Sequence, residues 1–124
     1  MKIAIVGSRN LKVDALEEYL PKEVTEIVSG GARGVDTSAE RYARTHGLKL
    51  TIFFPDYDQY GKIAPLKRNR EIVEYADEVY AFWDGVSRGT SYTIEMAKSC
   101  AKPVRVFLKK NDTFVEYYST FTLL

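Results

Sequence analysis

The chain has 124 residues, which is enough for one domain with a buried core and too few for two. Its 18 basic and 17 acidic residues give a net charge of +1, which argues against a dominant nucleic-acid or membrane-surface role. A single cysteine and a single histidine exclude a disulfide framework and most metal and triad chemistry. The sequence shows no leader and no segment of transmembrane length, so it predicts a cytoplasmic protein. We expect no metal and no cofactor at its site.

Short apolar runs alternate with segments of helical periodicity along most of the chain. Continuous apolar runs between breakers are typical of buried strands, and apolar residues every three or four positions are typical of amphipathic helices. In chain order we expect a strand over 2–7, a helix over 13–20, a strand over 24–29, a helix over 35–46, a strand over 48–54, a helix over 64–76, a strand over 77–83, a helix over 90–101 and a strand over 103–108.

This alternation predicts an α/β fold, in which a five-stranded parallel sheet carries helices on both faces. We expect one domain over 1–110, with 111–124 as a C-terminal strand or docking tail of the same domain. Within this tail, 113–124 is aromatic and rich in strand-forming residues. It is compatible with an extra edge strand, with docking on the core, or with a contact to a second subunit in a homodimer.

The turns richest in glycine and charge all follow predicted strands. They are GSR (7–9), SGGARGVD (29–36), PDYDQYGK (55–62) and DGVSRGT (84–90). In an open parallel sheet these turns lie at the carboxyl edge, where such sheets bind their ligands. The turns at the opposite edge have no comparable feature. The sequence therefore predicts a binding site at the carboxyl edge of the sheet.

Two explanations fit the glycines of GGARG. Helix N-termini present free N–H groups and the positive end of a dipole, so glycines there let a phosphate approach closely. Arg33 can add a bidentate phosphate contact. Alternatively, Gly30 and Gly31 only turn the chain, and Asp36 or Thr37 caps the helix. Of the two explanations, phosphate binding is favoured.

The turn SRGT (87–90) has the same physical features at the start of another predicted helix. Gly89 permits close approach, and Thr90 can either cap the helix or donate its hydroxyl to a phosphate. The segments 7–9 and 66–71 can add polar and basic groups to the same cleft. The expected ligand-binding residues are Gly7, Ser8, Arg9, Gly30, Gly31, Ala32, Arg33, Gly34, Arg68, Asn69, Ser87, Arg88, Gly89 and Thr90.

Three further expectations concern Trp83, the segment 55–62 and Cys100. Trp83 can pack in the core or stack on a base, and packing is favoured because aromatic residues at strand ends usually pack. The segment 55–62, with its tyrosines, is a candidate lid over the site. Cys100 is expected to pack in the interior.

Six motifs in order resemble the Lonely-Guy/DNA-processing-protein superfamily of Rossmann-like domains, SLOG, and especially its YspA-like, cpYpsA-related branch. The motifs are VGSR, SGGARGVD, FFP…YGK, RNREIVEYAD, AFWDGVSRGT and AKPVRVF. The resemblance covers about residues 2–108. It implies a nucleotide-binding fold with strand order 3-2-1-4-5 and a ligand cleft between the two glycine turns.

The Lonely-Guy enzymes of this superfamily are phosphoribohydrolases, whose site combines an arginine with the glutamate of a PGGxGTxxE motif. The resemblance implies that Arg68, nine residues before Asp77, corresponds to the arginine. The glutamate does not carry over, because Thr93 occupies its position. Glu95 is two residues further on, which turns it by roughly 200° around the helix and away from that position.

The missing glutamate bears on function, because glycosidic cleavage passes through an oxocarbenium-like state that a carboxylate stabilises. The remaining catalytic candidates are Arg68, Asp36 and Asp84. We interpret the chain as a module that binds a nucleotide or nucleotide-derived phosphorylated small molecule, with sensing of that ligand as a role that such binding can serve. The alternative is an N-glycosidase of the nucleoside monophosphate phosphoribohydrolase type. Single-stranded DNA binding is a remote alternative, weakened by the near-zero net charge, and no membrane partner is expected.

Overall fold

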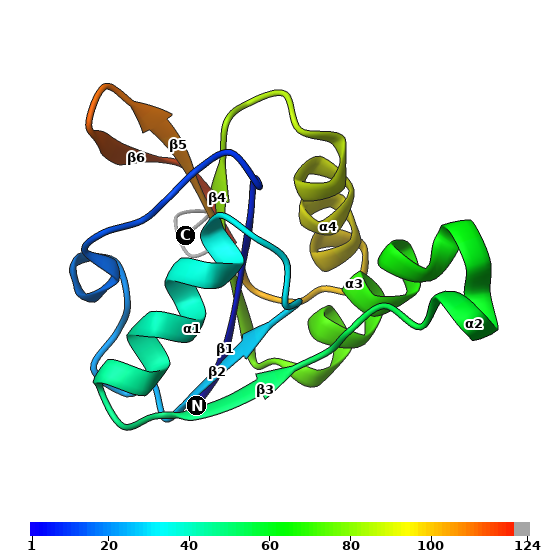
Figure 1. The fold of residues 1–124 in the computed structure, drawn as a ribbon. Coiled ribbons are helices and arrows are strands. Elements are labelled where there is room, and N and C mark those ends of the chain that lie inside the picture. The colour runs from blue at the N-terminus through cyan, green and yellow to red at the C-terminus, as the bar shows by residue number, and fades with distance from the viewer. Residues whose placement is uncertain (121–124) are drawn as a thin grey trace.

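The computed structural model describes residues 1–120, which form a six-stranded sheet in the order β3-β2-β1-β4-β5-β6 (Figure 1). The parallel strands are β1 (Lys2–Gly7), β2 (Glu26–Ser29), β3 (Lys49–Ile52), β4 (Glu78–Trp83) and β5 (Val104–Lys110). The antiparallel strand β6 (Thr113–Ser119) pairs with β5. The predicted Rossmann-like α/β fold, its strand order and the extra C-terminal strand are confirmed. Residues 121–124 of the expected tail lie outside the described residues.

Helices cover both faces of the sheet, as Figure 1 shows. Helix α1 (Val35–Thr45) lies on one face, and α3 (Ala64–Tyr75) and α4 (Arg88–Ser99) lie on the other. The β3–α3 connection holds a short helix α2 (Tyr57–Tyr60) and a 3₁₀ turn η2 (Gly61–Ile63). Within residues 1–120, no helix combines the length and the apolar character that crossing a membrane requires.

The expected helix over 13–20 is wrong, because this segment forms only a 3₁₀ turn, η1 (Leu16–Glu18). Its backbone and side chains are held by distant parts of the fold instead. The N–H of Val13 donates to Ser38 Oγ at 3.0 Å. The ring of Tyr19 packs edge-on against Phe82 and two other phenylalanines. Tertiary contacts therefore override the helical periodicity of the segment.

Strand β1 divides the core between the two faces, because successive side chains of a strand point in opposite directions. Ile3 and Ile5 are buried in the cluster that includes α1, whereas Ala4 and Val6 belong to the cluster that includes α3 and α4. This central strand is thus anchored on both faces. Its carboxyl end at Gly7 leads directly into the loop that forms part of the site.

The structure agrees with the expectation for Trp83 and contradicts the one for Cys100. Trp83 packs against the cluster that includes α4, and its indole N–H donates to the Ser87 carbonyl at 3.0 Å. This contact agrees with the favoured packing interpretation. Cys100 is exposed, so the expectation that it packs is wrong. The reason is its position at the C-cap of α4, where the chain turns away from the buried helix face.

Candidate functional site

A cavity of about 660 Å³ opens at the carboxyl edge of the sheet. It lies where the loops after β1, β2 and β4 meet α1, α3 and α4. Among the residues expected to bind ligand, those lining it are Gly7, Ser8, Arg9, Gly30, Ala32, Arg33, Arg68, Asn69, Ser87, Gly89 and Thr90. Asp36, Asp84 and Thr93 also line it. The fold thus brings together turns that are far apart in the sequence.

Three of the expected residues do not line this cavity. Gly31 lines a second, smaller hollow next to it. Gly34 packs closely against the Arg9 backbone. Its φ is +76°, and an added Cβ would collide with the Arg9 carbonyl oxygen, so the position requires glycine. Arg88 is an exposed residue at the start of α4.

The surroundings of Gly31 and Gly89 differ, although both were expected to let a phosphate approach. An added Cβ at Gly31, where φ is +73°, would lie 2.6 Å from a ring carbon of Phe54, so this glycine makes room for packing. Gly89 has no heavy atom within 4 Å of an added Cβ, although it lines the cavity. Its position in the first turn of α4 is therefore open to an approaching ligand.

Arg68 is a buried cation on α3, with only 6% of its surface exposed. Its Nη1 donates to the Gly30 carbonyl oxygen, and its Nε donates to Asn69 Oδ1 at 2.8 Å. Within residues 1–120, no carboxylate lies within ion-pair distance of the guanidinium. Burial lowers the pKa of Arg68, and the nearby charge of Asp36 opposes this effect. The positive charge therefore faces the cavity without a direct counter-ion.

Asp36 lies in the first turn of α1 and is 8% exposed. Its Oδ2 accepts a hydrogen bond from the Ala32 N–H at 3.1 Å. Burial raises the pKa of Asp36 to about 6, although this hydrogen bond and the charge of Arg68 act in the opposite direction. Neither Asp36 nor Thr37 is the N-cap, which is Gly34; the Thr37 hydroxyl donates to the Ala32 carbonyl. Both side chains hold the glycine loop in place.

Asp84 has a different environment at the end of β4. Its carboxylate accepts hydrogen bonds from the backbone N–H groups of Val86 and Ser87, and from the Ser87 hydroxyl at 2.6 Å. Burial acts to raise the pKa of Asp84, but these hydrogen bonds, led by that of Ser87, outweigh it and lower the pKa to about 2. An ionised carboxylate with these contacts shapes the loop before α4 and is a poor proton donor.

This loop leaves the first turn of α4 open to the cavity. Ser87 is the N-cap, but its side chain makes no cap hydrogen bond because its hydroxyl is bound to Asp84. The N–H groups of a first helical turn lack partners within the helix and attract anions. Thr93, one turn later, is 2% exposed and donates to the Gly89 carbonyl, whereas Glu95 is exposed and pairs with Lys98. Glu95 thus points away from the site.

Sequence reasoning missed part of the lining, including Asn10, Leu66 and the positions of α3 that flank Arg68. The α3 residues of the lining include Pro65, Arg68, Asn69 and Ile72. This is the i, i+3, i+4, i+7 pattern of one helix face, so the spacing from Arg68 contained the missing signal.

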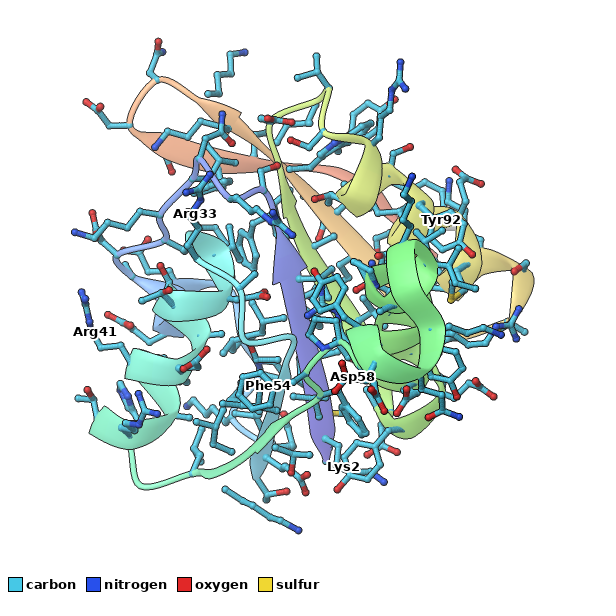
Figure 2. The ribbon with its side chains drawn as sticks, turned by 45° about the vertical axis from the view of Figure 1, so that its right-hand side comes forward. Lys2, Arg33, Arg41, Phe54, Asp58 and Tyr92 are labelled. Carbon is cyan, nitrogen blue, oxygen red and sulfur yellow. The ribbon has the colours of Figure 1, made fainter. Side chains whose placement is uncertain are left out.

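The second hollow, of about 390 Å³, shares residues with the main cavity and extends toward the β3–α3 connection. Pro55 and Tyr57 line it, and both belong to the segment 55–62 that was a candidate lid. Tyr60 and Lys62 of that segment are not among its lining residues. In Figure 2, Phe54 of the same connection lies between the ribbons of α1 and α3. No cluster of side chains suited to a metal ion occurs in residues 1–120.

Three comparisons with known proteins each found a match. A model of the YspA, cpYpsA-related SLOG family matches residues 1–60. Gene 61 protein of Mycobacterium phage D29 is 35% identical over 116 residues, which cover 83% of this chain and 93% of that protein. A solved structure of DNA processing protein A from Helicobacter pylori, described for its single-stranded DNA binding mode, matches with a TM-score of 0.70 and 23% identity, covering 92% of this chain and 68% of that one.

Proposed function

The chain belongs to the YspA, cpYpsA-related SLOG family, and on this basis we propose that it binds a nucleotide or a nucleotide-derived phosphorylated ligand in the carboxyl-edge cavity. The observation that carries the proposal is the charge distribution of the lining. Arg9, Arg33 and Arg68 line the same cavity as the open first turn of α4. Guanidinium groups and helix N-termini are both anion-binding groups, and together they suit phosphate.

The carboxylates of the lining do not cancel this preference. Asp84 is ionised, but its oxygens are occupied by hydrogen bonds from its own loop. The pKa of Asp36, raised to about 6, lets this carboxyl take up a proton as the pH falls toward 6, which removes its repulsion of a bound anion. The volume of about 660 Å³ is within the usual range of small-molecule sites.

A role in binding nucleotides or nucleic acids fits both the family and the fold. The DNA processing protein A of Helicobacter pylori is described for binding single-stranded DNA, so the likeness in fold weakens the expectation that nucleic acid is an unlikely partner. A small ligand remains the favoured proposal because the net charge is only +1 and the basic side chains of the site surround a cavity.

Calorimetric titration with AMP and adenosine tests this proposal. We expect AMP to bind and adenosine to bind far more weakly, because the cavity offers arginines to the phosphate. Arg68→Ala is expected to lower the affinity for AMP by roughly 10- to 150-fold, the range for a hydrogen bond to a charged group. Arg70→Ala, an exposed position on the same helix, is the matched control. Equal affinities for AMP and adenosine would refute the phosphate site.

A phosphoribohydrolase is the second candidate, and the environment of Asp36 favours it. A carboxyl group with a pKa of about 6 inside the cavity can exchange a proton near neutral pH. We nevertheless expect little or no release of ribose 5-phosphate from AMP, because Thr93 occupies the position where the hydrolases of the superfamily have glutamate. Robust turnover by the wild type that disappears in Asp36→Asn would establish the enzyme and displace the binding module.

A further inference from the structure

The main cavity and the second hollow meet at a common wall. The residues that line both are Arg9, Gly30, Ala32, Arg33 and Arg68. From this wall the main cavity extends toward Gly89 and Thr90, and the second hollow extends toward Pro55 and Tyr57. Arg9, Arg33 and Arg68 therefore line both spaces.

The far end of the second hollow offers an aromatic surface. Tyr57, in the first turn of α2, is 57% exposed, and Pro55 lies beside it in the lining. Tyr57 is the aromatic side chain of this lining; Phe54, 67% exposed, lies next to Gly31 but does not line the hollow. Tyr57 and Arg68 line the same hollow. Flat apolar rings beside guanidinium groups are the combination that binds a nucleobase next to its phosphate.

We propose that the second hollow is a nucleobase subsite, and that the ligand is a dinucleotide whose two nucleosides are joined through phosphates. The phosphate linkage lies against the shared arginines, one nucleoside lies in the main cavity, and the base of the other stacks on Tyr57. This inference rests on the proposed nucleotide binding and names the ligand class. The main cavity alone is within the usual range for a small ligand, so a mononucleotide leaves the second hollow of about 390 Å³ without an occupant.

Calorimetric titration of the full chain with AMP, ADP and diadenosine pyrophosphate tests the inference. ADP carries the same two phosphates as the dinucleotide but lacks the second nucleoside, so it isolates the contribution of that unit. We expect diadenosine pyrophosphate to bind roughly 5- to 150-fold more tightly than ADP, the range for one stacked base.

The subsite residue is tested by substitution. Tyr57→Ala is expected to remove the gain of diadenosine pyrophosphate over ADP while leaving the affinities for AMP and ADP unchanged. Tyr57→Phe is expected to retain the gain, because it keeps the ring. Tyr60→Ala, in the same helix but outside the lining of the hollow, is the matched control.

The possible outcomes separate this inference from the proposed function. Binding of AMP and ADP without a gain for the dinucleotide would refute the inference alone. Equal weakening of all three ligands by Tyr57→Ala would also refute it, since the tyrosine would then serve the phosphate site or the fold. Oligothymidylates of increasing length are titrated in the same way. An affinity that rises with their length, together with no gain for the dinucleotide, would refute the inference and favour nucleic-acid binding instead. Failure of all three nucleotides to bind would refute the proposed function and this inference with it.

Discussion

Asp36→Asn is expected to stabilise the protein near neutral pH. The pKa of Asp36 rises from 3.8 to about 6 on folding, so the native state binds a proton more tightly than the unfolded chain does. For such a group, the contribution to the free energy of unfolding is fully present below pH 3.8 and is lost as the pH rises through about 6. A shift of about two units corresponds to about 3 kcal/mol. Asparagine removes this loss, and its amide oxygen can still accept from the Ala32 N–H.

The assay is urea unfolding of the wild type and of Asp36→Asn at several pH values between 4 and 7. Other groups titrate in both proteins, so the difference between the two free energies of unfolding isolates Asp36. We expect this difference to be near zero at pH 4 and to grow in favour of the variant to as much as ~3 kcal/mol at pH 7. Asp58→Asn, at an exposed position on α2, is the control.

Two results would refute this reasoning. A difference that stays constant from pH 4 to pH 7 would mean that burial does not perturb Asp36. A variant less stable than the wild type at pH 7 would mean that the ionised carboxylate stabilises the fold through the nearby charge of Arg68. In either case the proton-binding role assigned to Asp36 in the cavity would lose its support.

Further substitutions test individual contacts of the site. Gly89→Val is expected to abolish AMP binding at a nearly unchanged urea midpoint, because the added side chain enters open space in the cavity; retained affinity in calorimetry would contradict this. Gly31→Val is expected to lower the free energy of unfolding by roughly 1–3 kcal/mol through its positive φ and its contact with Phe54, so a wild-type urea midpoint would be the contrary result. Ser8→Ala leaves the Asp84 N–H without its acceptor and is expected to cost about 1–3 kcal/mol in the same assay, whereas an unchanged stability would show that this contact is dispensable.

The strands followed from the sequence because buried strands are short apolar runs, and their order followed from the family resemblance. The segment 13–20 did not, because its periodicity fits a helix while its conformation depends on partners far along the chain. Tyr19, for example, packs on Phe107 and Phe114. Local patterns do not contain such contacts. Cys100 was misjudged for a simpler reason, since its type favours burial but its position at the end of α4 does not.

The location of the candidate site was predictable to the level of loops. Glycine- and charge-rich turns after strands must gather at one edge of a parallel sheet, and the lining of the cavity contains residues of three of them. The roles of individual residues were not predictable. Gly31 and Gly89 look equivalent in the sequence, but one accommodates a phenylalanine ring and the other faces open space. Likewise, Asp36 and Asp84 are both carboxylates in turns, and only the structure shows their opposite pKa shifts.

The contacts of Tyr19 also determine when folding can be completed. Its hydroxyl lies 3.3 Å from Thr113 Oγ1 and accepts from the Phe114 N–H, across 94 and 95 residues of sequence. The segment around η1 therefore receives the last of its partners only after β6 has been synthesised. A nascent chain that ends before Thr113 lacks this anchor, and its Tyr19 and Phe82 rings lack their contacts with Phe114. Such long-range closure slows folding and places this step after the synthesis of β6.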